Sequence, residues 1–510
     1  MADVNTGTVF TTLFLLFVIS WIFWRKHRSN GKHNLKLVFP PGPAGPLWLG
    51  NLYGHDIDKL HLCVEDWGRK YGKIFMGTYF GSKLVFLNDP KLLRKVLSAG
   101  VYDDSLNDRP PFFASKYVVK HKDILLGRFS DELVALRKVL HGSLGVYGEG
   151  VQRFEDVIQT EIGTFLSKIE KTNGGDFDLK IYFKHSISNV ISTLLSGETF
   201  DEEDPGLDMF WEYNSWGQQL VHPSNDKVLS MFPFLRHLPG RYGNIFRNTM
   251  RAREKILERF FLQAKKTYCS GEIRGIVDHM LSIKEDQEAR GNPWFTDDHI
   301  EGLILDIIAA GLTTSFVALT GLFLILLEKK EIQTSIQTEI DRVIGNGRPP
   351  RISDRNKMPY SQAVILETLR YLSHVPLAIP HYCSKGVAVE GYTIEEGSLV
   401  FPYLWGIHHN EELWEEPWEM NPRRFLDDEG NLLPPDHPKR QNLLPFGVGR
   451  RVCPGEAFGK GRLFLYMTNL LQRFDFLPPD GASLPSHDPR TFESSLTLVP
   501  PDFTCRIRKR

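Results

Sequence analysis

A single cysteine in a glycine-punctuated loop near the C-terminus limits the folds open to this chain more than any other feature. Residues 446–455 read Phe-Gly-Val-Gly-Arg-Arg-Val-Cys-Pro-Gly, and an apolar helix is predicted over residues 457–471. Backbone N–H groups and the helix dipole favour the thiolate form of Cys453, and a bound metal ion would complete its deprotonation. The other four cysteines are scattered, which excludes a disulfide framework or a paired-cysteine zinc site. A buried, inert cysteine is the alternative, and the glycine-rich loop disfavours it.

The loop resembles the heme-binding signature of the cytochrome P450 family, Phe-x-x-Gly-x-Arg-x-Cys-x-Gly. The fixed positions of that signature fall on Phe446, Gly449, Arg451, Cys453 and Gly455. Such a match arises by chance in on the order of one chain in several thousand, so it is a specific hypothesis. The resemblance covers residues 39–510 and implies heme b as the cofactor, with Cys453 as the proximal iron ligand. It also implies that Arg451 contacts a propionate, that Phe446 packs beneath the ring and that Gly449 lets the backbone approach the cofactor.

A charge network is the second element of the resemblance. Glu367 and Arg370 have the family's Glu-x-x-Arg spacing, and Arg424 follows within Pro-Arg-Arg-Phe. The spacing alone is weak evidence, because Glu339 and Arg342 repeat it, and a surface pair of this kind is worth only about 0.2–0.5 kcal/mol. The distances to Arg424 and to the cysteine loop favour Glu367. The resemblance implies a buried structural network behind the heme, in which loss of one member costs about 3–5 kcal/mol.

A small-residue turn lies within the long apolar segment of residues 296–327. Its sequence Ala-Gly-Leu-Thr-Thr-Ser, residues 310–315, resembles the oxygen-activation turn of the family. The resemblance implies that Thr314 donates a hydrogen bond to dioxygen or water, whereas a mid-helix threonine more often bonds to its own helix. The preceding position is usually acidic and is Thr313 here, so proton delivery needs a water chain or another group. Asp306, two turns earlier on the same face, is a candidate for that role or for orienting substrate; an exposed helix carboxylate is its alternative.

Two predicted propionate contacts depart from the commoner family pattern. Arg137 ends a Trp-x-x-x-Arg element in which Leu133 replaces the tryptophan. His381 follows Pro380 where arginine is commoner, and histidine at this place resembles the steroid 17-alpha-hydroxylase group. A surface histidine is the alternative interpretation of His381. The C-terminal third resembles the steroid 17-alpha-hydroxylase and aryl-hydrocarbon hydroxylase group most closely, which leaves the substrate open.

The N-terminus is predicted to anchor the chain in a membrane. Residues 9–24 are almost wholly apolar, and a basic cluster follows them at once. This length and charge bias predict a transmembrane signal anchor over residues 1–24 with its C-terminal side cytosolic. A cleaved signal peptide is the alternative, but the basic n-region and the small-residue cleavage site are missing. A basic, proline-rich linker over residues 25–50 and a catalytic domain over residues 51–510 complete the organisation, which is typical of a single-pass protein of the endoplasmic reticulum membrane.

The remainder predicts a mainly α fold with small β-sheets, that is, the α+β arrangement of the P450 fold. The 61 basic and 62 acidic residues leave a net charge of −1, which disfavours a nucleic-acid partner. A hairpin is predicted within residues 74–87, and short strands around residues 391–400 and near the C-terminus. Helices are predicted where apolar residues recur at spacings of three and four, over residues 61–71, 90–99, 131–144, 151–170, 248–268, 296–327, 331–344 and 360–372.

The resemblance implies a monooxygenase that inserts one oxygen atom from dioxygen into a lipophilic small molecule. Its electrons would come from NADPH through a cytochrome P450 reductase, with cytochrome b5 as an optional second donor. The chain carries no Gly-x-Gly-x-x-Gly dinucleotide loop of its own. Two other functions stay open: a heme-thiolate isomerase or dehydratase that rearranges peroxides, which the missing acid at Thr313 favours and Thr314 disfavours, and a heme protein that binds steroids without turnover.

Two groups of side chains receive provisional roles from the family layout. Basic residues near the cysteine are candidates for docking the reductase, with a solvated face as the alternative; they are Lys138, Arg450, Lys460 and Arg462. Apolar residues are candidates for lining the substrate pocket, with core packing as the alternative; they are Phe112, Phe113, Phe210, Trp211, Leu377 and Leu496. The apolar stretch 231–235 is a candidate for dipping into the bilayer.

Overall fold

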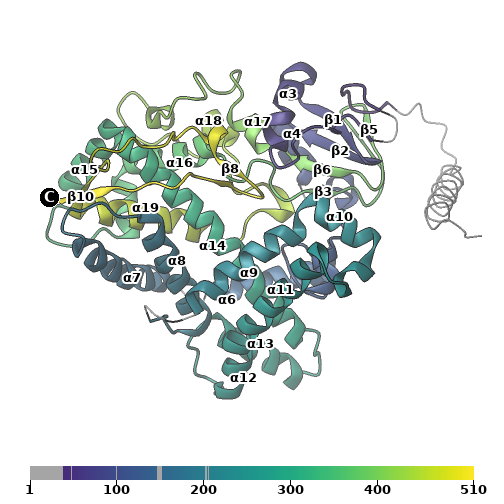
Figure 1. Cartoon of the computed structure of the whole chain (residues 1–510), viewed down its shortest axis with the longest axis horizontal. Helices are drawn as coiled ribbons and strands as arrows, with labels where there is room; N and C mark the ends of the chain where they lie inside the picture. Colours follow the sequence, from purple (N-terminus) through teal and green to yellow (C-terminus); the bar gives the residue numbers. More distant parts are fainter. Residues whose placement is uncertain (1–37, 47–48, 99, 146–151, 202–203, 205) are drawn as a thin grey trace, which may run out of the picture.

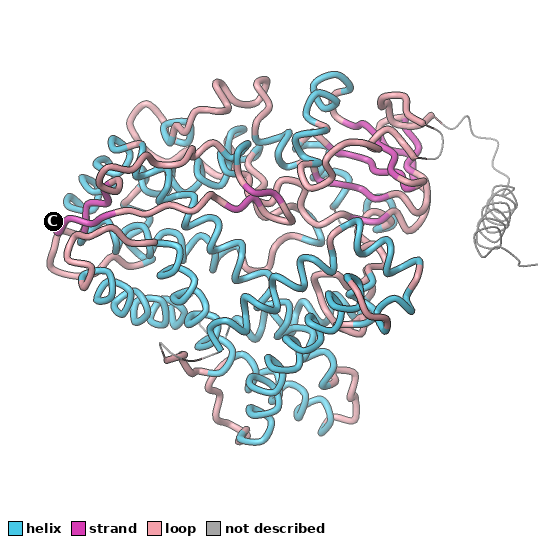
Figure 2. The backbone as a smooth tube through the Cα atoms, in the orientation of Figure 1, coloured by secondary structure: helices cyan, strands magenta, loops and turns pink. Residues whose placement is uncertain are grey.

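The computed structural model describes residues 38–510, apart from residues 47–48, 99, 146–151, 202–203 and 205. The predicted membrane anchor over residues 1–24 therefore lies outside the described residues. Within them helices predominate and strands are short (Figure 2), which confirms the predicted fold class. The longer helices before residue 260 are α4 (Pro90–Leu97), α6 (Asp131–Gly145), α7 (Gln152–Glu170), α8 (Leu179–Ser196), α9 (Gly206–Val221), α10 (Pro223–Met231) and α11 (Arg241–Leu257). The longer helices after it are α13 (Ile276–Ala289), α14 (Asp297–Glu328), α15 (Lys330–Val343), α16 (Pro359–Leu372) and α19 (Glu456–Arg473).

A four-stranded sheet lies at one end of the molecule, at the upper right of Figure 1. In spatial order its strands are β1 (Ile74–Tyr79), β2 (Ser82–Leu87), β6 (Leu399–Pro402) and β3 (His381–Tyr382). The antiparallel pair β1–β2, with Ile74 opposite Leu87, is the predicted hairpin, and β2 pairs in parallel with β6 from the C-terminal third. The proline-rich segment packs against this sheet, because Met76 of β1 donates its N–H to the Pro41 carbonyl at 2.8 Å.

Three two-stranded sheets and several short helices complete the fold. The strands of these sheets are β4 (Val387–Val389), β5 (Tyr392–Ile394), β7 (Phe474–Leu477), β8 (Glu493–Ser494), β9 (Leu498–Val499) and β10 (Arg506–Lys509). The short helices are α2 (Leu60–Cys63), α3 (Glu65–Tyr71), α5 (Phe113–Tyr117), α12 (Gln263–Thr267), α17 (Leu404–His408) and α18 (Pro438–Asn442). The predicted helix over residues 61–71 is thus divided into α2 and α3 at Val64. The predicted helix 248–268 begins earlier, at Arg241, and contains a π-helical turn, Glu258–Leu262.

The long helix α14 forms the centre of the molecule. Thr296 and His299 cap its N-terminus reciprocally, which fixes where the helix begins. It packs against α8, α9, α16 and α19 (Figure 1). Within the described residues α14 alone is long and apolar enough to cross a membrane, yet most of its apolar stretch is buried inside the protein. Packing between helices, rather than lipid, therefore explains its composition.

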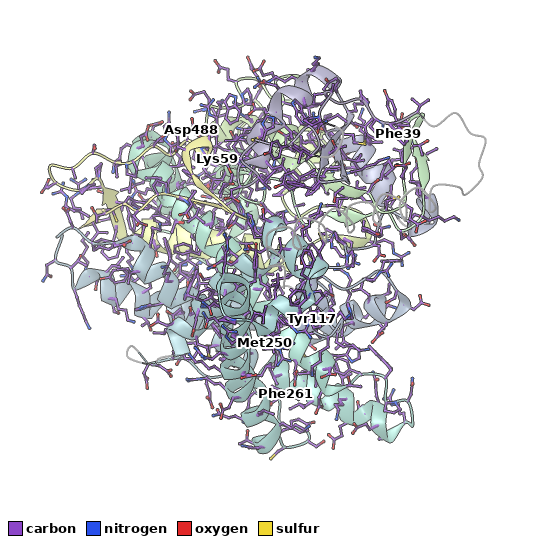
Figure 3. All side chains as sticks on the ribbon, turned by 45° about the vertical axis from the view of Figure 1, so that its right-hand side comes forward. Phe39, Lys59, Tyr117, Met250, Phe261 and Asp488 are labelled. Carbon is purple, nitrogen blue, oxygen red and sulfur yellow. The ribbon has the colours of Figure 1, made fainter. Side chains whose placement is uncertain are left out.

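Side chains fill the interior of both the helical part and the sheet part of the molecule. Figure 3 shows Tyr117, Met250 and Phe261 among the helices and Phe39 near the sheet. The main apolar core gathers the inner faces of the helices, and a second apolar cluster joins the sheet to α4. The cysteine loop packs against α4 through residues 449–451 and leads directly into α19, so the fold itself positions it.

Candidate active site

The cysteine loop is held by its own backbone and by the neighbouring helix α4. Cys453 donates its N–H to the Phe446 carbonyl at 2.9 Å, which closes the loop just before α19. Gly449 has a φ of +74°, and a Cβ there would come within 2.0 Å of the Leu97 carbonyl oxygen of α4. Gly449 is therefore needed for the close approach of the loop to α4, because other residues would clash and be strained.

The sulfur of Cys453 lies in a mixed electrostatic environment. Its side chain is exposed, yet neighbouring protein desolvates the sulfur, and this burial raises the pKa of the Cys453 thiol above its ordinary value. A hydrogen bond from the Gly455 backbone and the charge of Arg137 act in the opposite direction on that pKa. The thiol is thus prepared to become a thiolate once a metal ion supplies the remaining positive charge.

Three of the predicted cofactor-binding residues, one of them in the loop itself, lie close together. Arg451 donates to the carbonyls of residues 107, 124 and 127, at 2.8, 3.2 and 2.7 Å. Arg137 donates to the Val452 carbonyl at 2.6 Å, directly beside Cys453. His381, on β3, donates from Nδ1 to the Leu106 carbonyl at 2.7 Å and is buried, so the surface alternative for His381 is wrong.

Arg109 is a further member of this cluster that sequence reasoning missed. It is buried and donates to the carbonyls of residues 125, 379 and 380, at 3.3, 3.0 and 3.1 Å. Burial and the nearby charges of Arg451 and Arg137 hold the pKa of Arg109 well below its usual range. Burial and the charge of Arg109 likewise hold the pKa of His381 well below its ordinary value. Arg109 precedes two prolines in an irregular segment, so no motif or periodicity marks it.

The residues present fit a heme group. Arg109, Arg137, Arg451 and His381 come from four separate segments, and their hydrogen bonds go to neutral carbonyls rather than to carboxylates. Arg109 and Arg451 are buried and Arg137 is half-buried, and no carboxylate among the described residues is hydrogen-bonded to their side chains, although the charges of Asp108 and Asp123 act on two of them. Such cations are costly to bury, so the group favours a further anionic partner. The two propionates of heme would supply that charge, and Cys453, beside Arg137, would supply the sulfur ligand.

The oxygen-activation turn presents a strip of small side chains on a helix that is otherwise mostly buried. Ala310 is exposed, and Gly311, Thr314 and Ser315 are half-buried. The Thr314 hydroxyl donates to the Ala310 carbonyl at 2.6 Å, which is the bond to its own helix that the alternative predicted. The oxygen of Thr314 keeps its lone pairs free in this arrangement, and the small residues leave room for a ligand.

Thr313 and Asp306 point away from this strip. Thr313 is buried and accepts hydrogen bonds from the side-chain amides of Asn214 and Gln218 on α9. Asp306 accepts from the backbone N–H groups of Ile124 and Leu125, at 2.7 and 3.2 Å. Burial, and then the charge of a neighbouring aspartate, raises the pKa of Asp306 well above its ordinary value. The exposed-carboxylate alternative for Asp306 is therefore wrong, since its side chain fastens the loop that Arg451 also holds.

Comparison with known proteins decides the family. The family description Cytochrome P450 matches residues 40–506. The chain belongs to the cytochrome P450 family. It is 30% identical to Cytochrome P450 2D20 of Mesocricetus auratus, over 99% of this chain and 98% of that protein. It is 29% identical to Cytochrome P450 2U1 of Mus musculus, over 99% of this chain and 96% of that protein.

A third relative carries a steroid-related name. The chain is 31% identical to Steroid 17-alpha-hydroxylase/17,20 lyase of Gallus gallus, over 91% of each protein. As a cytochrome P450, the protein is an oxidoreductase of the monooxygenase class, and its family binds heme. The predicted family and the predicted enzyme class are thereby confirmed.

The two Glu-x-x-Arg pairs of this cytochrome P450 differ sharply in the structure. Glu367 is fully buried and binds Arg370 at 2.8 Å and Arg424 at 3.1 Å. Glu339 instead accepts from the backbone N–H groups of residues 360 and 361, at 2.9 and 2.8 Å, and its partner Arg342 is largely exposed. The geometry therefore gives Glu367 the network position and makes Glu339 a cap for the start of α16.

Some side chains that were given pocket or docking roles have other places in the cytochrome P450 body. Phe210 is buried and stacks on Phe260 with ring centroids 5.3 Å apart, so it belongs to the core rather than to a pocket. Leu496 is exposed on the surface. Arg462 is buried against α14 and cannot form a docking surface. Lys138 is exposed, and Arg450 pairs with Asp104 at 3.0 Å.

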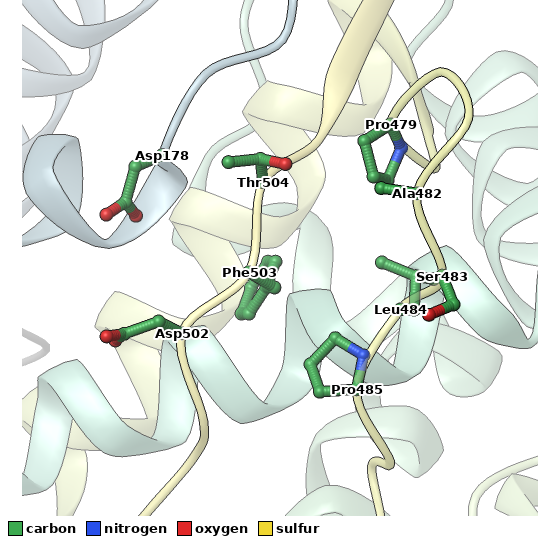
Figure 4. Close-up of a pocket in the computed structure, with 9 residues that line it drawn as sticks. All are labelled: Asp178, Pro479, Ala482, Ser483, Leu484, Pro485, Asp502, Phe503 and Thr504. Atoms are coloured by element: carbon green, nitrogen blue, oxygen red, sulfur yellow. The ribbon is translucent and has the colours of Figure 1, made fainter.

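A surface pocket lies apart from this site, between the start of α8 and the C-terminal segment (Figure 4). Its volume is about 280 Å³. It is lined by Asp178, Pro479, Ala482, Ser483, Leu484, Pro485, Asp502, Phe503 and Thr504. None of these residues belongs to the cysteine loop, the cationic cluster or the strip on α14.

Proposed function

We propose that this cytochrome P450 inserts one oxygen atom from dioxygen into a lipophilic small molecule, a steroid, lipid or xenobiotic. Electrons come from NADPH through a cytochrome P450 reductase, with cytochrome b5 as an additional donor. The observation that supports the proposal is that the Cys453 loop meets a largely buried group of arginines whose side chains have no hydrogen-bonded carboxylate among the described residues. That combination matches one group, a heme b with two propionates and one sulfur ligand.

Each residue of the site then has a defined task. Bound heme supplies the oxidising chemistry, and a thiolate ligand favours O–O cleavage. Cys453 would supply the thiolate, while Arg109, Arg137, Arg451 and His381 would hold the propionates. The three arginines would neutralise the propionates inside the protein, and the imidazole of His381, whose pKa burial holds well below its ordinary value, would contact them without adding charge.

The distal face of the site is formed by α14. Thr314 keeps its hydrogen on the Ala310 carbonyl and offers oxygen lone pairs, so it orients a water or a protonated ligand. Thr313 ties α14 to α9 instead of supplying an acid. Glu367, Arg370 and Arg424 fix the segments that support the cysteine loop and do not touch the reacting atoms.

The protein works at the membrane of the endoplasmic reticulum. The predicted anchor over residues 1–24 supports this location. Large apolar side chains are exposed after α10, where Phe232 and Phe234 lie with ring centroids 6.2 Å apart and Met231 is exposed beside them. This apolar stretch rests on the bilayer, and a lipophilic substrate would reach the site from the lipid phase.

The test is turnover by the purified full-length protein with reductase, NADPH and a library of steroids and lipids in phospholipid vesicles. We expect substrate-induced spectral shifts and an oxygenated product that forms only with dioxygen and NADPH. Turnover with peroxides alone would instead indicate an isomerase or dehydratase. Spectral shifts without product would indicate a steroid-binding protein. Where turnover is found, Cys453→Ala should abolish it.

A further inference from the structure

A buried arginine beside the strip on α14 has no role in the site described so far. Arg462 lies on α19, nine residues after Cys453, and is only 5% exposed. It donates to the Gly311 carbonyl at 3.2 Å and to the Ser315 hydroxyl at 2.7 Å. Both acceptors belong to the strip of small residues that also contains Thr314.

Arg462 has no anionic partner among the described residues. Its Nε–H is buried and finds no hydrogen-bond acceptor in the described part of the chain, and the Phe154 ring lies 5.8 Å from its guanidinium carbon. Burial lowers the pKa of Arg462 to about 10, so the group stays charged at neutral pH. Glu161 on α7 acts, like Arg462, on the buried Tyr466, and burial raises the pKa of the Glu161 carboxyl to about 7. A lone buried cation does not stabilise a fold, because an apolar side chain of similar size is equally good or better.

The directions of the hydrogen bonds distinguish the two neighbouring hydroxyl groups. The Thr314 hydrogen is already donated to the Ala310 carbonyl. Ser315 accepts from Arg462, and its own hydrogen has no acceptor within the described part of the chain. A hydroxyl has one hydrogen to donate, so Ser315 rather than Thr314 is the available donor on this strip. The adjacent positive charge strengthens that donor.

We propose that Ser315 is the hydrogen-bond donor to small ligands of the heme, and that Arg462 is the residue that positions and polarises it. The pair takes the place of the acid that the family usually has before the threonine, where this chain has Thr313. The favoured ligand is a small anion or an electron-rich diatomic molecule. This inference rests on the proposed heme site and adds to it the chemical preference of its distal face.

The test measures ligand binding rather than turnover, with cyanide, which binds as an anion, and imidazole, which binds as a neutral base. Heme spectra of the full-length protein report both dissociation constants. In Arg462→Met we expect cyanide affinity to fall about tenfold and imidazole affinity to stay unchanged. Ser315→Ala should weaken cyanide binding in the same direction, and Arg462→Lys should recover most of the loss. Lys460→Met, which removes a half-buried charge from the same helix, is the matched control.

Several results would overturn the proposal. Unchanged cyanide affinity in Ser315→Ala, or equal weakening of cyanide and imidazole in Arg462→Met, would contradict it. A failure of Arg462→Lys to recover cyanide affinity would contradict the role of the charge. Arg462→Met should keep its melting temperature; if it does not load heme, Ser315→Ala decides alone. A wild-type protein without a thiolate-type carbon monoxide spectrum would refute the heme site itself, which is a distinguishable outcome.

Discussion

Two groups of buried arginines in this molecule differ in what neutralises them. Behind the cysteine loop, Arg370 and Arg424 share the carboxylate of Glu367. Around the loop, the side-chain hydrogen bonds of Arg109, Arg137 and Arg451 within the described residues go only to neutral carbonyls, although the charges of Asp108 and Asp123 act on Arg109 and Arg451. The first group is complete within the protein and belongs to the fold. The second group needs an anion from outside the chain, which is why it marks a ligand site.

The largest expected effect tests the group in which Glu367 neutralises Arg370 and Arg424. Glu367→Gln leaves Arg370 and Arg424 buried without a counter-charge, which should cost about 3–5 kcal/mol in the free energy of unfolding. Urea unfolding of the purified protein, or its failure to accumulate when expressed, measures this loss. A stability within 1 kcal/mol of wild type, on the order of a surface substitution, would show that the network is not needed for the fold.

The second effect tests the arginines around the cysteine loop, which need an anion from outside the chain. Arg109→Met removes a buried cation whose side chain has no hydrogen-bonded carboxylate among the described residues, so the heme-free protein should keep or gain stability. The same change should speed the loss of heme to a scavenging apoprotein by roughly 10–100-fold, as expected for a charged hydrogen bond of about 1.5–3 kcal/mol. Unchanged heme release together with a large loss of stability would place Arg109 with the fold-supporting group instead.

The free energy of unfolding should depend on pH through His408, which lies beside Arg370. Arg370 donates to the His408 carbonyl, and burial lowers the pKa of the His408 imidazole to about 3. In the unfolded chain His408 binds a proton near pH 6.5, whereas in the folded chain it stays neutral until about pH 3. The free energy of unfolding therefore falls as the pH drops below 6.5. Between pH 6.5 and 5, wild type should lose about 2 kcal/mol more than His408→Gln. Parallel urea midpoints for the two proteins would contradict this assignment.

The smallest effect separates the two Glu-x-x-Arg pairs. Glu339→Gln removes a cap of α16 but leaves no buried cation unpaired, so about 1–2 kcal/mol should be lost. The comparison with Glu367→Gln in the same urea experiment is the measurement. Equal losses in the two variants would mean that burial of the arginines does not distinguish the pairs.

Local signals in the sequence predicted the parts of the site that lie close together along the chain. The cysteine loop, the β1–β2 hairpin and the central helix each depend on residues within one segment, where glycines, turn residues and apolar spacing decide the structure. The network around Glu367 was also predicted, because its spacing to Arg424 is part of a known motif. The side chain of Thr313 could not be placed in this way, because its partners Asn214 and Gln218 lie on α9 and meet it only in the folded chain.

Contacts between distant segments could not be predicted in this way. Arg109 owes its role to carbonyls of residues 125, 379 and 380, which only the folded chain brings to it. Arg462 reads as a surface charge in the sequence, because lysine and glycine precede it, and only the packing of α19 on α14 buries it. Charged side chains carry no apolar periodicity, so their burial depends on tertiary structure alone.

The carbon monoxide difference spectrum of the reduced, full-length protein tests most directly whether Cys453 and the cationic cluster hold a heme. The wild-type protein should show the red-shifted band of a thiolate-ligated heme, and Cys453→Ala should lose that band. A wild-type spectrum without the band, or a Cys453→Ala spectrum that keeps it, would contradict the assignment.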